Sequence, residues 1–312
     1  MKAYCLILAF LFCAPAFAGE SKNFKLDAGG YKRVYSVYAP VNLDQTKKYP
    51  LLVLLHGGGS TGKGMSRLAR GGFEKLADKN GAILAYPDAV DKNWNDGRGD
   101  KTRKSQRENI DDAAFLSAMA DKISEKYPVD ASRVYASGIS NGAMMSYALA
   151  CLASGRFAAV APVAGAMPEK LSAVCRPARP VPLLIINGTE DGLVHWEGGY
   201  VTGPFGKQKL GRIRSAEKSR DLWLEKNSCD PAKKTVSKKD SDPSDGTAVI
   251  REVYGPCAGG SAVEFVKIDG GGHTWPGGLQ YMPAAVIGKT SRELDATTEI
   301  WNFLMKHSLP AK

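Results

Sequence analysis

The pentapeptide Gly138-Ile139-Ser140-Asn141-Gly142 constrains the fold more than any other stretch of the chain. It follows a strand-like run at residues 132–137 and opens a helix-like run at residues 143–150. A sharp turn between a strand and a helix lifts a serine out of the backbone, and its flanking residues must be glycine because strand and helix pass too close for a Cβ. The pattern therefore predicts that Ser140 is a nucleophile.

A second stretch, Gly58-Gly59-Ser60-Thr61-Gly62, fits the same G-x-S-x-G pattern. Ser60 is followed by Lys63 and Gly64, which start a helix poorly. A nucleophilic serine of this kind needs a helix directly behind it, so Ser140 is the better candidate.

Continuous apolar runs at residues 50–55 and 181–186 are typical of strands that are buried on both faces of a sheet. Further strands are expected at residues 82–86, 158–161, 248–254 and 262–268, with an N-terminal hairpin over residues 23–39. Helices are expected at residues 65–79, 111–126 (capped by Asn109), 215–226 and 294–306. Strands that alternate with helices predict an α/β fold with a mostly parallel sheet and helices on both faces. Residues 19–312 form one domain in this interpretation.

The first 18 residues have the pattern of a secretory signal peptide. Lys2 precedes the apolar run from Leu6 to Phe12, and Ala16-Phe17-Ala18 is a small-x-small cleavage site. The run is too short to span a bilayer. We therefore expect an exported protein, extracellular or periplasmic, with no membrane contact after the signal is removed.

Export leaves four cysteines, because Cys5 and Cys13 lie in the signal segment. An even number in an oxidising compartment favours two disulfides. Three connectivities are possible, and the one that closes the shortest loops joins Cys151 to Cys175 and Cys229 to Cys257.

A serine hydroxyl needs a base to take its proton and a carboxylate to orient that base. His273 lies in a glycine-rich loop after the strand 262–268, and Asp191 directly follows the strand 181–186. Parallel sheets collect their sites at the carboxyl ends of strands, and the order Ser, acid, His is that of α/β-hydrolases. We expect Ser140, Asp191 and His273 to form a triad.

The loop that begins with His56 follows the strand 50–55, where this fold places an oxyanion-hole amide. The expected donors are the backbone N–H groups of Gly58 and Asn141, and His56 itself is expected to be structural. The rival site residues are expected on the surface; they are Glu190, His195 and His307.

The formal charge is +10, or +9 without Lys2, the only charged side chain of the signal. Its basic runs, such as Lys101, Arg103 and Lys104, lack interleaved aromatic residues, so a solvated face is expected and no nucleic acid partner. A P-loop match at residues 57–64 lacks the Ser or Thr that would bind magnesium, and a calcium-loop match at residues 91–102 lacks its Gly and Glu. We expect no metal and no cofactor.

Several further motifs resemble one family. They are His56-Gly57-Gly58-Gly59, Tyr86-Pro87-Asp88-Ala89, residues 93–98 (NWNDGR), residues 111–116 (DDAAFL), the elbow at residues 137–145, Gly188-Thr189-x-Asp191 and residues 271–278 (GGHTWPGG). The chain resembles the secreted polyhydroxybutyrate-depolymerase-type esterases, which are related to feruloyl and acetyl xylan esterases, over residues 30–306. The resemblance implies the same fold and triad. It also implies that Trp275 and Trp94 help to form the substrate pocket.

These expectations describe a cofactor-free serine esterase that acts on short or oligomeric hydroxyacyl esters. Polymer-degrading members usually carry a polymer-binding module, and none follows the last helix here, which favours soluble esters. The alternatives are a feruloyl or acetyl xylan esterase, a secreted peptidase on the same fold, and a catalytically dead hydrolase-fold binding protein. The sequence predicts no oligomeric state.

Overall fold

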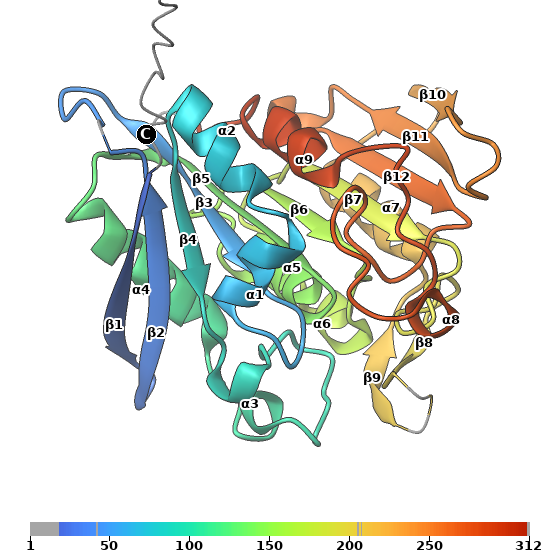
Figure 1. The fold of residues 1–312 in the computed structure, drawn as a ribbon, viewed down its shortest axis with the longest axis horizontal. Helices are drawn as coiled ribbons and strands as arrows, with labels where there is room; N and C mark the ends of the chain where they lie inside the picture. The colour runs from blue at the N-terminus through green and yellow to red at the C-terminus, as the bar shows by residue number, and fades with distance from the viewer. Residues whose placement is uncertain (1–18, 42, 205, 207, 311–312) are drawn as a thin grey trace, which may run out of the picture.

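The computed structural model of the chain describes residues 19–41, 43–204, 206 and 208–310. The proposed signal peptide, residues 1–18, lies outside this range. A ten-stranded sheet runs through the described chain in the order β1-β2-β4-β3-β5-β6-β7-β12-β11-β10 (Figure 1). The strands are β1 (Glu20–Ala28), β2 (Tyr31–Ala39), β3 (Tyr49–Leu55), β4 (Ile83–Pro87), β5 (Val129–Ile139), β6 (Ala159–Val163), β7 (Leu183–Gly188), β10 (Lys234–Lys239), β11 (Ala248–Tyr254) and β12 (Val263–Asp269).

The centre of this sheet is parallel, and its two edges are antiparallel. Strands β4, β3, β5, β6, β7 and β12 pair in parallel, whereas β1 and β2 on one side and β11 and β10 on the other pair antiparallel. The parallel arrangement brings the carboxyl ends of β5, β7 and β12 to the same edge of the sheet. The α/β-hydrolase fold expected from the sequence is confirmed in its architecture.

Strand β3 shows why its apolar run is continuous. Its odd-numbered leucine and valine residues join one core cluster, and Leu52 and Leu54 join the other, so both faces of the strand are buried. The first face is covered by α4 (Asp112–Ser124), α5 (Asn141–Leu152) and α7 (Ala216–Lys226). The second is covered by α1 (Gly62–Leu68), α2 (Gly72–Asn80) and α9 (Ala296–Leu304), and α2 and α9 lie side by side in Figure 1.

The expected helix over residues 65–79 is wrong in one respect, because it is two helices. Arg70 and Gly71 both have a left-handed backbone, with φ of 57° and 65°, which ends α1 and starts α2 in a new direction. The expected cap of α4 is also wrong. Asp111 caps that helix by accepting from the Ala114 N–H, whereas Asn109 lies two residues earlier with φ of 49°.

Several elements have no counterpart in the sequence expectations. They are the short helices α3 (Lys104–Arg107), α6 (Glu169–Val174) and α8 (Ala284–Ile287), the separate two-stranded sheet of β8 (Gly199–Thr202) and β9 (Lys209–Ile213), and the edge strand β10. Every residue of β10 is exposed, so the strand has no alternating apolar pattern to predict it.

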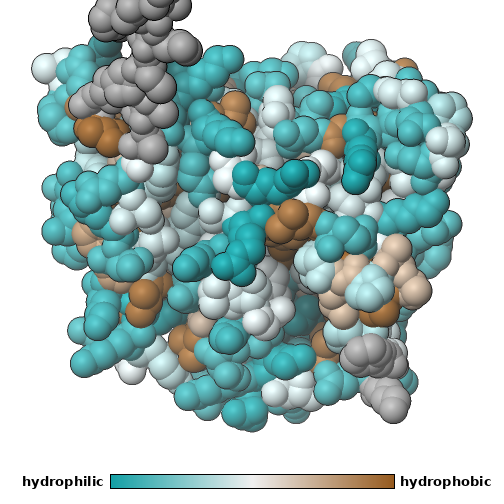
Figure 2. All heavy atoms as spheres, viewed as in Figure 1, coloured by the Kyte–Doolittle hydropathy of each residue, from teal (hydrophilic) through white to brown (hydrophobic). Residues whose placement is uncertain are grey.

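Two disulfides join Cys151 to Cys175 and Cys229 to Cys257, which confirms the nearest-neighbour pairing. Disulfides persist in oxidising compartments, so both fit an extracellular or periplasmic protein. Among the residues that the structure describes, no helix is long and apolar enough to cross a membrane. Hydrophilic residues cover most of the face shown in Figure 2, and apolar residues gather there only in small patches.

Candidate active site

Ser140 lies at the turn between β5 and α5. Its φ of 58° and ψ of −118° are a strained backbone conformation for a residue other than glycine. The turn is fixed from both sides, because the Ser140 N–H donates to the Val163 carbonyl (3.0 Å) and its carbonyl accepts from Met144 (2.9 Å). The strand–serine–helix arrangement expected from the sequence is present in the structure.

The two glycines of the pentapeptide are explained by close backbone contacts. A Cβ on Gly142 would lie 2.3 Å from the Leu55 carbonyl oxygen, and a Cβ on Gly138 would lie 2.5 Å from the same atom. Both positions therefore exclude any larger residue, because the obstacle is the backbone of β3 rather than a flexible side chain.

Asp191 and His273 come from loops that touch each other. The Glu190 N–H donates to the Gly271 carbonyl (2.8 Å), which joins the loop after β7 to the loop after β12. His273 Nδ1 lies 2.7 Å from Asp191 Oδ2, and the side chains of both residues are almost completely buried. The other Asp191 oxygen accepts from the backbone N–H groups of Leu193 (2.9 Å) and Val194 (2.7 Å). These bonds fix the carboxylate against the imidazole.

An Nδ1–H that donates to Asp191 leaves Nε2 of His273 as the acceptor of the ring. His273 and Ser140 line the same cavity, which has a volume of about 540 Å³. Within the described residues no hydrogen bond joins the two side chains. Catalytic hydrogen bonds are often formed only when substrate is bound, so the geometry suits a serine and a base that meet across a bound ester.

The two expected oxyanion donors lie beside each other at this cavity. Gly58 and Asn141 both line it, and a Cβ on Gly58 would lie 3.8 Å from the Cβ of Asn141. Neither backbone N–H donates to another group in the described part of the chain. Two free backbone N–H groups beside Ser140 have the arrangement that stabilises the negative charge formed when a serine attacks a carbonyl.

His56 and Trp94 support the loop that carries Gly58. The His56 ring accepts from the Ala89 N–H at Nε2 (3.1 Å) and bonds the Gly57 carbonyl through Nδ1 (2.8 Å), which fits the structural role expected for it. Burial lowers the pKa of His56, so its neutral form is favoured. Trp94 donates its indole N–H to the His56 carbonyl (2.9 Å).

The structure does not place Trp94 or Trp275 in the wall of the cavity, which corrects the role that the family resemblance implied. Both indoles are 0% exposed. Trp275 donates to Thr297 Oγ1 (3.0 Å) and packs edge-on against Phe73 in the core. Each tryptophan is fixed by its own hydrogen bond and lies outside the set of residues that line the cavity.

The rival residues lie as follows. Glu190 is exposed, as expected. His195 is half-buried and is not among the described residues that line the cavity. The expectation for His307 is wrong, because its ring is half-buried against Phe303 and burial lowers its pKa to about 4.

Sequence reasoning missed several charged or polar residues that line the cavity, among them Tyr281, Arg67, Arg98 and Arg103. Tyr281 donates its hydroxyl to the His273 carbonyl (3.0 Å). The signal for Arg98 was present, since it ends the family motif at residues 93–98. The sequence predicts a solvated face for Arg103, because its basic run lacks interleaved aromatic residues. Among the residues that the structure describes, no group of three His, Cys, Asp or Glu side chains could hold a metal.

Comparison with known proteins identifies the family of the chain. Residues 33–178 match the family model described as "Esterase PHB depolymerase". A relative described as "Putative esterase NocK", from Nocardia uniformis subsp. tsuyamanensis, is 32% identical over 82% of this chain and 74% of its own length. The chain belongs to the esterase PHB depolymerase family. It is therefore a carboxylic ester hydrolase of the serine hydrolase fold.

Two further proteins are similar to this chain, one in sequence and one in fold. "Feruloyl esterase B" from Piromyces equi is 30% identical over 75% of this chain, and the match spans 41% of that longer protein. The solved structure of an acetyl xylan esterase from Aspergillus awamori superimposes with a TM-score of 0.54. That superposition covers 81% of this chain and 94% of the other at 16% identity, so it supports the fold alone.

Proposed function

We propose that the chain is an exported serine esterase in which Ser140, His273 and Asp191 carry the reaction. The observation that supports this most directly is the buried 2.7 Å contact between His273 Nδ1 and Asp191 Oδ2 at the cavity that Ser140 also lines. Export is supported by the two disulfides and by the signal-like pattern of residues 1–18.

The chemistry follows from the position of each group. His273 Nε2 takes the Ser140 proton as the hydroxyl attacks the ester carbonyl, and Asp191 stabilises the resulting imidazolium. The Gly58 and Asn141 amides donate to the oxyanion of the tetrahedral intermediate. His273 then protonates the departing alcohol, and water attacks the acyl-enzyme to release the acid.

The substrates we propose are short or oligomeric hydroxyacyl esters. The matched family model and the mainly apolar cavity wall of Leu193, Val201, Leu210 and Leu279 support this class. Feruloyl or acetyl xylan esters are the second candidate, because the relatives and the similar solved structure include proteins with those names.

The test compares Ser140→Ala with Ser60→Ala in the purified chain. Ser60 also lines the cavity, so its replacement is a matched control for a lost pocket hydroxyl. We expect Ser140→Ala to abolish hydrolysis of p-nitrophenyl butyrate and 3-hydroxybutyrate oligomers, with Ser60→Ala retaining it. Hydrolysis by Ser140→Ala above background would refute the proposal. An inactive but folded unmodified chain would favour the binding-protein alternative.

A further inference from the structure

The cavity beside Ser140 has cationic side chains in its wall and no carboxylate. Arg67, Arg98 and Arg103 line it, whereas no Asp or Glu does so among the described residues. Hydrolysis of a neutral ester requires no cation at this wall. Placing a guanidinium at a partly apolar cavity is costly unless something satisfies it. Arg98 and Arg103 have the carboxylates of Asp96 and Asp100 beside them, at 3.5 to 3.9 Å. Arg67 is exposed and makes no ion pair within the described residues, so the wall keeps a positive charge that suits an anionic group of a ligand.

The Arg98 guanidinium has N–H donors that make no hydrogen bond within the described residues. Its side chain is only 4% exposed, and Nη1 donates to the thioether of Met144 (3.3 Å), which is a weak acceptor. Its Nε has no hydrogen-bond partner among the described residues, although Asp96 Oδ2 lies 3.5 Å away. Asp100 Oδ2 lies farther away still, at 3.9 Å from Nη2. A guanidinium has five N–H donors, and Nη2 makes no hydrogen bond within the described residues, so this nitrogen can donate to a ligand oxygen.

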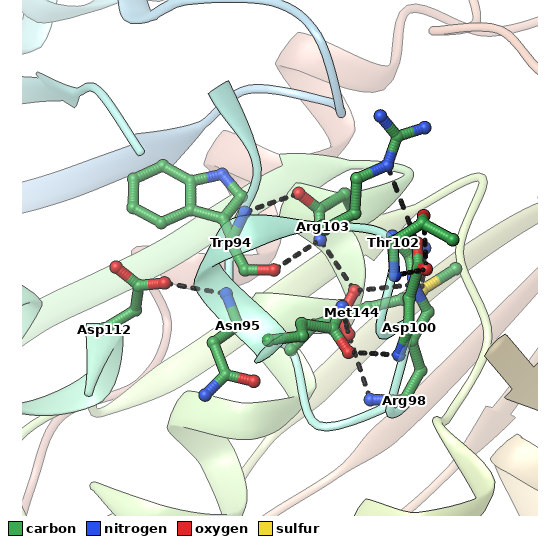
Figure 3. Close-up of polar contacts among 11 residues, drawn as sticks. Trp94, Asn95, Arg98, Asp100, Thr102, Arg103, Asp112 and Met144 are labelled. Atoms are coloured by element: carbon green, nitrogen blue, oxygen red, sulfur yellow. Dashed lines mark hydrogen bonds and ion pairs between the residues drawn. The ribbon is translucent and has the colours of Figure 1, made fainter. Parts of the chain in front are cut away.

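Arg103 is the more accessible of the pair. Its side chain is 34% exposed, and its contact with the loop is through Nε, which lies 3.6 Å from Asp100 Oδ2. Figure 3 shows the terminal nitrogens of Arg103 extending beyond Asp100, with no dashed line to any residue drawn. Asp100 is held from behind, since its other oxygen accepts from the Thr102 N–H (2.9 Å) and hydroxyl (2.6 Å). Asp100 thus orients Arg103 through Nε and, within the described residues, leaves its two terminal nitrogens free to bind a ligand.

Arg98 and Arg103 line the same cavity as Ser140, and Arg98 is also linked to the residue after Ser140. The side-chain Nδ2 of Asn141 donates to Asp96 Oδ2 (2.6 Å), and the same oxygen lies 3.5 Å from Arg98 Nε. The buried Asp96 carboxylate thus contacts both Asn141, the residue after Ser140, and Arg98. A single small substrate can span this interval inside a cavity that both groups line.

We propose that the cavity binds esters that carry a free carboxylate, which Arg103 and Arg98 hold while Ser140 attacks the ester bond. The inference rests on the proposed function and names its substrate class. An arginine fork matches a carboxylate through two parallel hydrogen bonds. The carboxylate can belong to the alcohol side, as at the end of a hydroxyacyl oligomer, or to the acyl side, as in a half-ester of a diacid.

Two matched pairs of substrates distinguish these sources. On the alcohol side, the linear 3-hydroxybutyrate dimer is compared with its terminal amide. On the acyl side, the p-nitrophenyl half-ester of glutaric acid is compared with the p-nitrophenyl ester of glutaramic acid, in which an amide replaces the free carboxylate. We expect kcat/KM for the acid to exceed that for the amide by about 10- to 100-fold in one pair, the size of a hydrogen-bonded charge contact. The ratio should shrink in high salt, because Arg103 is partly exposed.

Three variants test the assignment. Arg103→Gln should lower the acid-to-amide ratio by about tenfold, mainly through KM, and Arg103→Lys should recover part of it by restoring the charge without the fork. Arg107→Gln is the control, because Arg107 belongs to α3, the short helix that directly follows Arg103, but lies outside the cavity lining. It should leave the ratio unchanged.

Acid-to-amide ratios near one in both pairs would overturn the inference, as would an equal loss of the ratio in Arg107→Gln. Failure of the unmodified chain to hydrolyse these four esters and p-nitrophenyl butyrate would instead refute the proposed function, and the inference with it. Hydrolysis of p-nitrophenyl butyrate but of none of the four would overturn the inference alone.

Discussion

Asn141 is the residue whose side chain should matter most for the stability of the active-site loops. It is 1% exposed and makes three hydrogen bonds to the loop after β4. Its Oδ1 accepts from the Trp94 N–H (2.7 Å), and its Nδ2 donates to the Trp94 carbonyl (3.1 Å) and to Asp96 Oδ2 (2.6 Å). Replacing Asn141 by Ala removes all three bonds at once.

The expected cost follows from the two kinds of bond. Each neutral bond contributes about 1 kcal/mol and the bond to a carboxylate about 2 kcal/mol, so Asn141→Ala should lower the free energy of unfolding by about 4 kcal/mol. Asp96 Oδ2 would keep only the Arg98 contact at 3.5 Å, and it would stay buried. At about 2 °C per kcal/mol for a chain of this size, Tm should fall by about 8 °C.

The matched control is Asn95→Ala in the same loop. Asn95 is half-buried, and its side chain makes two bonds to neutral acceptors, the Ile110 carbonyl (2.9 Å) and Asn109 Oδ1 (3.2 Å). We expect a cost of about 1 kcal/mol there, because the bond to Asn109 is exposed to solvent and contributes little beside the partly buried bond to Ile110. Denaturant unfolding followed by circular dichroism, with the disulfides intact, measures both. Equal losses in the two variants would refute the hydrogen-bond accounting.

The remaining predictions concern the base, a buried histidine and the disulfides. Asp191→Asn should keep the fold but place a donor opposite His273 Nδ1, which favours the wrong tautomer of the imidazole. We expect kcat in steady-state ester hydrolysis to fall by about 10⁴-fold, and a loss below tenfold would contradict this role of Asp191. His307 has its pKa lowered to about 4, chiefly by burial and then by Lys306 and Arg179, so its stabilising effect is complete above its ordinary pKa near 6.5 and is lost as pH falls towards 4. His307→Gln should therefore flatten the decline of Tm across that range, and parallel Tm curves would argue against the assignment. The Cys229–Cys257 bridge closes a sequence separation of 28 residues, so replacing both cysteines by Ser should cost about 3.5 kcal/mol in denaturant unfolding; a cost under 1 kcal/mol would mean that the loop is ordered without it.

The parts of this structure that were predictable from sequence are those set by local pattern. The apolar run of β3 and the Gly-flanked Ser140 each have a short-range physical cause, since one is buried on two faces and the other lies against the Leu55 carbonyl. The positions of Asp191 and His273 followed from the rule that parallel strands end at one edge of the sheet.

The parts that were not predictable depend on contacts distant in sequence. Arg103 belongs to a charged run with no apolar periodicity, and only the folding of its loop towards Ser140 places it at the cavity. For the two tryptophans the sequence prediction is wrong in the other direction, because it places buried residues in the cavity wall. A motif identifies Trp94 and Trp275 as important, but their hydrogen bonds to His56 and Thr297 show that they pack behind the site.

The most direct test of the account is labelling of the purified mature chain with a fluorophosphonate, followed by peptide mass spectrometry. We predict one adduct per chain, on Ser140, and none in Ser140→Ala. An adduct on Ser60, or no adduct on a folded chain with both disulfides formed, would contradict the assignment of Ser140 as the nucleophile.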